Sequence, residues 1–212
     1  MKLTKYHHAC VSIEQDNQLL IIDPGSLGEL PEDILHVVAI VVTHVHPDHL
    51  SKEHLRSIVD VNPDAKIFTT SEVAEQLEDF TNVVEVLAED IEHVGVFSLE
   101  FFGADHAVIH KSKPVAQNIG VLVNDSLYYP GDSFTLPEKP VQTLLAPASA
   151  PWLKTGEAMD FISNVHPQLT IPTHDELLSD DGKTFTDMWL QQSVDAIQGN
   201  YKRLQSGESI AI

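Results

Sequence analysis

The sequence predicts an α/β fold with mixed sheets. Short apolar runs rich in β-branched residues alternate along the chain with segments in which apolar residues recur at helical spacing. Two of the runs, Leu19–Ile22 and Val37–Val42, are apolar throughout, which is typical of central strands covered on both faces. Another two runs, Ile119–Val123 and Leu127–Tyr129, are separated by a short gap and therefore indicate a hairpin.

Strands are predicted wherever a short apolar run is bounded by turn residues. In chain order the clear strands are Leu19–Ile22, Val37–Val42, Lys66–Thr70, Ile119–Val123, Leu127–Tyr129 and Leu169–Ile171. A further strand-like run, Phe97–Phe102, lies between the third and the fourth of these.

Helices are predicted in the segments between the strands. Ser51–Asp60 and Ser71–Asp79 each begin with a capping residue, and Thr155–Val165 has apolar residues at helical spacing. The longest candidate is Thr184–Gln205. One side of this last helix is expected to pack on the rest of the fold through Met188, Trp189, Val194, Ile197 and Leu204.

Length and composition favour one domain over residues 1–212, because a chain of this size can bury a self-sufficient core. Cys10 is the single cysteine, so no intramolecular disulfide can form. The segment Met1–Glu14 lacks a basic start followed by a long apolar run, and no stretch of about 18 apolar residues occurs. We therefore expect a cytoplasmic protein without a signal peptide or a membrane span.

The formal net charge of −20 repels phosphate backbones, and no basic stripe offsets it, so we expect no nucleic-acid partner. The 12 histidines equal the lysines and arginines combined. Since imidazole is a common metal ligand, this ratio directs attention to metal sites. The expected partner is a small-molecule substrate, while a homo-oligomer stays open.

The densest group of metal-ligating side chains lies in residues 43–49 (Thr-His-Val-His-Pro-Asp-His), directly after a predicted buried strand. His44 and His46 are two positions apart in an extended segment, so both can point at one ion. Pro47 then turns the chain, and Asp48 and His49 can reach a second ion nearby. Imidazole together with carboxylate suits Zn²⁺, Mn²⁺ or Fe²⁺.

This loop resembles the His-x-His-x-Asp-His signature of the metallo-β-lactamase-fold hydrolase superfamily. Further elements of that family are matched in order by Ala104-Asp105-His106, Tyr129-Pro130-Gly131-Asp132-Ser133, Ile171-Pro172-Thr173-His174 and the early Leu19–Gly25 with its Asp-Pro-Gly turn. The resemblance spans nearly the whole chain. It implies a metallo-β-lactamase-like αββα sandwich, in which two mixed β-sheets are flanked by helices.

The resemblance also implies a site for two divalent metal ions, zinc first, with manganese or iron as alternatives. By analogy the first ion is held by His44, His46 and His106, and the second by Asp48, His49 and His174, with Asp132 between them. Asp23 has two open interpretations: a residue that orients a ligand from behind the histidine loop, or an ordinary turn aspartate before Pro24.

Departures from other relatives narrow the resemblance to the branch with ascorbate-6-phosphate lactonase-like and N-acyl-phosphatidylethanolamine phospholipase-like proteins. Leu50-Ser51 stands where glyoxalase II-like relatives have Gly-Gly, and Asp132 stands where many antibiotic-degrading relatives have Cys. His46 argues against flavodiiron relatives, which usually have a carboxylate there. RNA-processing members carry extra domains and basic surfaces, which this chain lacks.

The predicted function is hydrolysis of a small-molecule ester, lactone or phosphoester through a metal-bridging hydroxide, with Asp48 both binding metal and orienting the attacking group. One alternative is a mononuclear iron oxidoreductase of the persulfide dioxygenase type. Another is a metal-binding domain without turnover.

The histidines outside the family pattern are interpreted as bystanders; they are His7, His8, His36, His54, His93, His110 and His166. A solvated loop is likewise the first interpretation for His110, Lys111, Lys113, Trp152 and Lys154. The alternative is that they line the pocket, where His110 and its lysines would capture an anionic substrate group.

Overall fold

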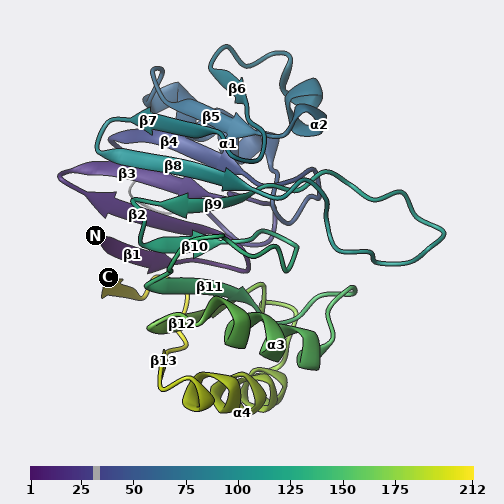
Figure 1. The fold of residues 1–212 in the computed structure, drawn as a ribbon. Coiled ribbons are helices and arrows are strands. Elements are labelled where there is room, and N and C mark those ends of the chain that lie inside the picture. Colours follow the sequence, from purple (N-terminus) through teal and green to yellow (C-terminus); the bar gives the residue numbers. More distant parts are fainter. Residues whose placement is uncertain (31–33) are drawn as a thin grey trace.

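The computed structural model describes residues 1–30 and 34–212, and in these residues two seven-stranded sheets pack face to face with helices on their outer faces (Figure 1). The strand order of the first sheet is β14-β1-β2-β3-β4-β5-β6, and that of the second is β13-β12-β11-β10-β9-β8-β7. This arrangement confirms the αββα sandwich with two mixed sheets.

The strands of the first sheet are β1 (Lys2–Lys5), β2 (Val11–Gln15), β3 (Gln18–Ile22), β4 (Val37–Val42), β5 (Lys66–Thr69), β6 (Val83–Glu85) and β14 (Ser209–Ala211). Those of the second are β7 (Ile91–Val94), β8 (Phe97–Phe102), β9 (Gly120–Val123), β10 (Leu127–Tyr129), β11 (Thr143–Pro147), β12 (Leu169–Thr173) and β13 (Asn200–Tyr201). The helices are α1 (Lys52–Val61), α2 (Ser71–Ala74), the short 3₁₀ helix η1 (Glu75–Leu77), α3 (Thr155–Val165) and α4 (Asp180–Ala196).

The main core lies between the two sheets. Leu20, Ile22 and Val41 of the first sheet meet Val121 and Leu145 of the second there. The intervening side chains of β3 and β4 point the other way and pack under α1 and α2, while α3 and α4 cover the second sheet. Leu19–Ile22 of β3 and the whole of β4 pack against other elements on both faces, and both runs are apolar throughout, as predicted.

Several predicted elements match the structure residue for residue, among them the strands Val37–Val42, Phe97–Phe102 and Leu127–Tyr129 and the helix Thr155–Val165. The hairpin of β9 and β10 is confirmed by their antiparallel pairing. Within the described residues, the prediction omitted β1, β2, β6, β7, β11, β13 and β14.

The predicted helix Ser71–Asp79 is shorter than expected: α2 is capped by Thr70 and gives way to η1, which ends at Leu77. The helix predicted over Thr184–Gln205 is wrong at both ends. It begins four residues earlier, where the Ser179 side chain accepts a hydrogen bond from the backbone N–H of Gly182.

At its C-terminal end α4 stops because Gln198 takes a left-handed φ of 59° and the Gly199 N–H bonds back to Val194 O at 3.0 Å. Val194 packs in the core as expected, but Met188 and Trp189 are 48% and 37% exposed, so the expected packing face was wrong there. No helix in the described parts of the chain is long and apolar enough to cross a membrane.

Candidate metal centre

The sheet topology brings the predicted site segments to one edge of the sandwich. β8 and β10 run in the same direction because each is antiparallel to β9, and β11 and β12 are parallel to β10. His106, Asp132 and His174 follow β8, β10 and β12, so they emerge at the same edge. In the first sheet β1, β3 and β4 also share a direction. The loops after these strands gather on the right-hand side of Figure 1.

The histidine loop after β4 is packed tightly against the turn after β3. Ser26 N–H donates to Pro47 O at 2.7 Å, and His49 N–H donates to His46 O at 3.0 Å. A Cβ atom at Gly25 would lie 1.9 Å from Asp48 O. The early Asp-Pro-Gly turn therefore needs glycine at this position so that the loop can approach the turn.

The first cluster of ligand-type atoms comprises His44, His46, His106 and Asp132, all within 4.8 Å of one another. His44 Nε2 lies 3.1 Å from His46 Nδ1, and His106 Nε2 lies 3.3 Å from Asp132 Oδ2. His46 is half-buried, whereas the other three side chains are buried.

The second cluster comprises Asp48, His49 and His174, together with His8. His174 Nε2 lies 3.3 Å from Asp48 Oδ2. Asp132 Oδ1 lies 3.3 Å from both His49 Nε2 and His174 Nε2, so the two oxygens of Asp132 face different clusters. This is the placement that a carboxylate needs in order to bridge two ions.

The residues fit divalent cations on two grounds. First, His49 Nε2, His106 Nε2, His174 Nε2 and Asp132 Oδ1 are buried and have no hydrogen-bond partner. Buried polar atoms are otherwise almost always paired. Second, tetrahedral coordination with bonds of about 2.0–2.1 Å separates ligand atoms by about 3.3 Å, which is the spacing found around Asp132.

Surrounding oxygen atoms fix which ring nitrogen of each histidine faces the cluster. His106 Nδ1–H donates to Ala107 O and His174 Nδ1–H to Ser149 O, both at 2.5 Å. His49 Nδ1–H donates to Asp23 Oδ2 at 2.6 Å. In each ring the lone pair of Nε2 is thereby left for a cation.

Asp23 is a buried orienting residue. Besides the His49 ring it accepts hydrogen bonds from Thr43 N–H and Thr43 Oγ1–H, both at 2.8 Å. The Thr43 hydroxyl, having donated its proton, accepts from His44 Nδ1–H at 3.0 Å. Of the two interpretations of Asp23, the structure supports the one in which it lies behind the histidine loop and holds a candidate ligand.

The electrostatics of the site keep both carboxylates ionised. Burial raises the pKa of Asp132, but the neighbouring imidazoles, His49 foremost, outweigh burial and hold it well below its usual value. The pKa of Asp48 is likewise lowered, against burial, by the adjacent imidazoles of His174 and His8. Burial lowers the pKa of His44 well below its usual value, so its ring is neutral. For His174, burial is outweighed by the two carboxylates, which raise its pKa to about 9.

Trp152 corrects one sequence interpretation. It is only 8% exposed, and its indole Nε1–H donates to Asp132 Oδ2 at 2.8 Å, so it is part of the site rather than of a solvated loop. Lys154, two residues on, is 80% exposed and pairs with Glu157 at 2.8 Å. His110, Lys111 and Lys113 are exposed on the loop after β8, as their first interpretation had it.

His8 corrects another interpretation, because it lies in the second cluster rather than among the bystanders. It follows β1, a strand that the sequence analysis did not recognise. Had Lys2–Lys5 and Val11–Gln15 been paired as a hairpin, the turn between them would have been placed at the same edge as the loop after β4. The possible hairpin of these two segments was therefore the signal by which the sequence could have placed His8 near the site.

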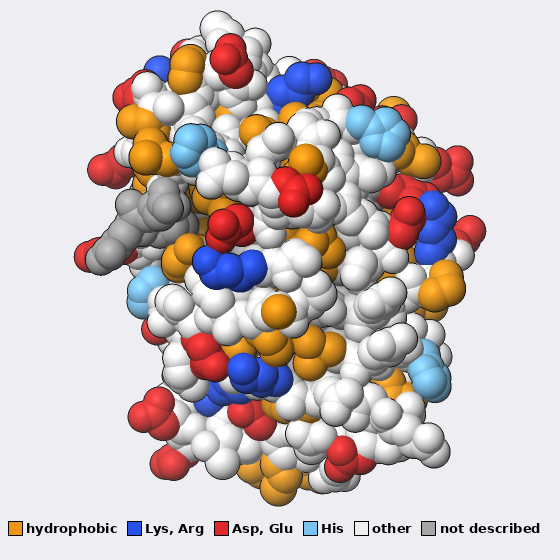
Figure 2. All heavy atoms as spheres, turned by 90° about the vertical axis from the view of Figure 1, so that its left-hand side faces the viewer, with side chains coloured by type: hydrophobic (Ala, Val, Ile, Leu, Met, Phe, Trp, Pro, Cys, Tyr) orange, Lys and Arg blue, Asp and Glu red, His pale blue; other side chains and the backbone are white. Residues whose placement is uncertain are grey.

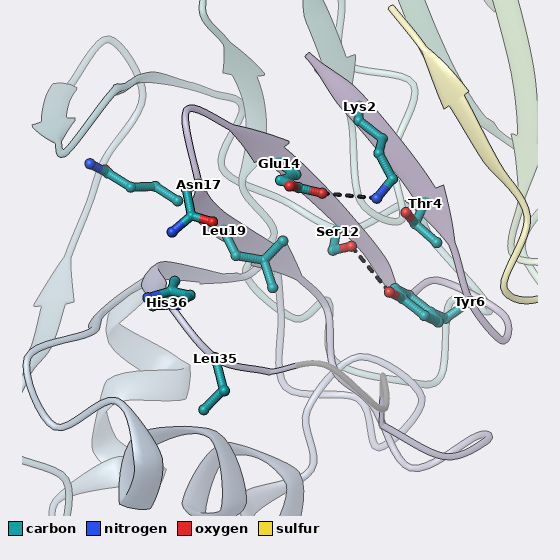
Figure 3. A pocket seen from close by; sticks show the side chains of 10 residues that line it. Lys2, Thr4, Tyr6, Ser12, Glu14, Asn17, Leu19, Leu35 and His36 are labelled. Atoms are coloured by element: carbon teal, nitrogen blue, oxygen red, sulfur yellow. Dashed lines mark hydrogen bonds and ion pairs between the residues drawn. The ribbon is translucent and has the colours of Figure 1, made fainter.

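A pocket elsewhere lies on the outer face of β1, β2 and β3 and is lined by other residues (Figure 3). Its polar groups pair with one another: Lys2 with Glu14 at 2.9 Å, and Ser12 Oγ with the Tyr6 hydroxyl at 3.3 Å. The face seen in Figure 2 carries acidic and basic side chains interspersed, without a continuous basic stripe. Neither feature presents converging ligands like those of the two clusters.

Comparisons with known proteins show the family and the fold to which the chain is similar. Residues 2–174 match the family model of the beta-lactamase superfamily domain. Protein Rv0786c of Mycobacterium tuberculosis is 35% identical over 188 residues, which cover 86% of this chain and 88% of that protein.

Among solved structures, the fold resembles Igni18, described as a novel metallo hydrolase from Ignicoccus hospitalis, with a TM-score of 0.75 and 18% identity over 99% of this chain and 97% of that one. It also resembles CmlA, a diiron beta-hydroxylase from Streptomyces venezuelae, with a TM-score of 0.76 and 14% identity over 100% of this chain and 54% of that one. These two likenesses concern the fold. By its family match and its relative in sequence, the chain belongs to the beta-lactamase superfamily.

Proposed function

We propose that this protein is a binuclear metal-dependent hydrolase of a small-molecule ester, lactone or phosphoester. The observation that carries the proposal is the pair of ligand clusters sharing Asp132, with buried nitrogen and oxygen atoms that lack hydrogen-bond partners. Membership of the beta-lactamase superfamily and the likeness to a metallo hydrolase support it. The shared core between the sheets further supports a single domain over residues 1–212.

The donor set proposed for the first ion is His44, His46, His106 and Asp132, and for the second Asp48, His49, His174 and Asp132. Mixed imidazole and carboxylate ligands suit zinc, with manganese or iron as alternatives. Two divalent cations bound there supply Lewis acidity toward a carbonyl or phosphoryl oxygen and lower the pKa of bound water.

Asp48 is the proposed catalytic residue because it is both ionised and accessible. Its side chain is 26% exposed, against 5% for Asp132. An ionised carboxylate at the open side of the site can bind a cation and accept a hydrogen bond from the attacking water, and so orient it. Trp152 donates a hydrogen bond to Oδ2 of the other carboxylate, Asp132, and so restrains it. Asp132 is thereby left with the role of linking the two clusters.

The alternatives are less well supported. A mononuclear iron oxidoreductase would need only the first cluster, yet the second has its own complete set of donors. In a metal-binding domain without turnover, the ion would be expected to be closed off from solvent on all sides. Here Asp48 and His46 are partly exposed, so the clusters are open on one side.

Metal content measured on protein purified without chelator tests the proposal. We expect about two ions per chain in the wild type, falling towards one in both His46→Ala and His174→Ala. His110→Ala is the matched control, because His110 lies on the exposed loop outside both clusters, and it should keep both ions. A single iron that survives His174→Ala would favour the oxidoreductase, and no bound metal would contradict the proposal.

Hydrolysis is then measured on the metal-loaded protein with activated esters, lactones and phosphodiesters. The expected result is turnover of at least one class that is lost on chelation and in His174→Ala but kept in His110→Ala. Two bound ions without turnover of any class would leave a metal-binding domain as the better description.

A further inference from the structure

His8 stands inside the second cluster although the neighbouring residues already offer a full set of donors. Its side chain is 1% exposed, and its Nε2 lies 3.1 Å from Asp48 Oδ2. Its ring centroid is 3.8 Å from that of His174. At these distances His8 could bind an ion itself, or it could act on Asp48 alone.

The protonation of the His8 ring distinguishes these roles. The backbone N–H of Glu176 donates to His8 Nδ1 at 3.4 Å, so Nδ1 is an acceptor and the ring proton lies on Nε2. In His49, His106 and His174 the arrangement is the reverse, because Nδ1–H donates to an oxygen and Nε2 keeps its lone pair. His8 thus presents an N–H group to the cluster where the other rings present a lone pair.

The surroundings of His8 hold this orientation firmly. His174 N–H donates to His8 O at 3.0 Å, which ties the turn after β1 to the loop after β12. The end of β1 and the loop after β12 are also joined by the buried ion pair of Lys5 and Asp175 at 3.0 Å. His8 itself has a left-handed φ of 53°, a conformation that histidine, asparagine and aspartate adopt more readily than most residues.

We infer that His8 is a positioning residue: it donates its Nε2–H to Asp48 Oδ2 and so fixes the direction of the carboxylate that is proposed to bind the second ion. The inference rests on the proposed function, since Asp48 has a ligand role only there. Trp152 provides a parallel within the same site, because its indole N–H donates to Asp132. Each carboxylate of the site then has one N–H donor of its own that is not itself a ligand.

Two amide substitutions test the role of the Nε2–H group. In His8→Gln the side-chain amide N–H can take the place of Nε2–H and reach Asp48. In His8→Asn the amide oxygen can still accept from Glu176 N–H, but the side chain is too short to reach Asp48. Zinc is titrated into the metal-free wild type and both variants against a competing chelator. The dissociation constant of the more weakly bound zinc ion is then compared among the three proteins.

We expect His8→Asn to weaken binding of the second zinc ion by about 10–100-fold, the usual effect of removing a hydrogen bond to a ligand. His8→Gln should recover most of that loss. A merely structural role predicts the opposite order, because asparagine suits a left-handed backbone better than glutamine does. Equal losses in the two variants would identify His8 as a ligand and overturn the inference, as would unchanged binding in both.

Long-range ¹H–¹⁵N NMR of the zinc-loaded wild type gives a second readout that does not depend on activity. The inference requires a protonated Nε2 and an unprotonated Nδ1 for His8. A protonated Nδ1 with Nε2 bound to zinc would refute it. Failure of the proposed function is recognised separately: two zinc ions bound without hydrolysis contradict the hydrolase alone. If no zinc binds, the same spectra of the metal-free protein still report which His8 nitrogen carries the proton.

Discussion

Replacing Asp23 by asparagine removes a carboxylate that touches no candidate ion and yet should disable half of the metal centre. Asp23 is fully buried and accepts three hydrogen bonds, from Thr43 N–H, Thr43 Oγ1–H and His49 Nδ1–H. The amide of asparagine can keep the first of these through its oxygen. At the position of Oδ2 the asparagine presents an NH₂ group, which is itself a donor. The Thr43 hydroxyl and His49 Nδ1–H, which donate to Oδ2 in the wild type, then have no acceptor there.

The size of the effect follows from the two lost hydrogen bonds. A hydrogen bond to a charged group contributes roughly 1.5–3 kcal/mol, so we expect the free energy of unfolding of the metal-free protein to fall by about 3–6 kcal/mol. The His49 ring can relieve the conflict by moving its proton to Nε2. That nitrogen lies 3.3 Å from Asp132 Oδ1 and would then donate to it instead of binding an ion.

The assay is a zinc titration of Asp23→Asn combined with urea unfolding of the metal-free protein. The first ion should bind as in the wild type, and the second about 10–100-fold more weakly. Asp125→Asn is the matched control, since it makes the same change of charge at a side chain that is 77% exposed. The control should change neither the zinc affinity nor the free energy of unfolding.

Two results would refute this reasoning. If Asp23→Asn, shown to be folded by circular dichroism, binds both zinc ions with wild-type affinity, then Asp23 does not determine the orientation of His49. A loss of both ions together would also contradict it, because it would mean that the two clusters are not separately supported.

Three further predictions concern the clusters and the residues around them. Trp152→Phe should keep the packing but remove the donor to Asp132, and so weaken zinc binding about 10–100-fold in the same titration. In the metal-free protein His174 has its pKa raised from 6.5 to about 9, so its bound proton stabilises the folded state fully below pH 6.5 and that contribution is lost as the pH rises through 9. Calorimetry should therefore show the Tm falling over this window, while zinc affinity rises because the proton no longer competes. Asp175→Asn leaves the buried Lys5 without its carboxylate and takes from the partly buried Arg203 one of its two, the other being Asp187, and it should lower the free energy of unfolding by about 3–5 kcal/mol, measured by urea denaturation. A steady Tm between pH 6.5 and 9, or an Asp175→Asn variant of wild-type stability, would contradict the respective prediction.

Sequence patterns were most informative where one local rule decides the structure. The strand Val37–Val42 is buried on both faces, so its apolar run is unbroken and easily recognised. The helix Thr155–Val165 has the apolar spacing of a helix that packs on one side only. In both, burial imposes a periodicity that can be read without knowing what the element packs against.

Short or edge strands were missed because they depend on a partner. β13 has two residues and β14 has three, too few for alternation to show, and each exists only through pairing with β12 or β1. The predicted end of α4 failed for a related reason. Leu204 continues the apolar spacing of the helix and is indeed buried, but it enters the core from a segment that follows β13.

By itself the sequence determined the ligand-type residues of the candidate site and their order, because residues 43–49 hold histidines and an aspartate at fixed local spacing and the later segments follow strand-like runs. Only the tertiary structure decided which other side chains join them. His8, Trp152 and Asp23 reach the clusters through strand pairing and loop contacts between positions far apart in the chain. Their roles rest on hydrogen bonds to one nitrogen or oxygen atom, and such contacts impose no periodicity that a sequence could show.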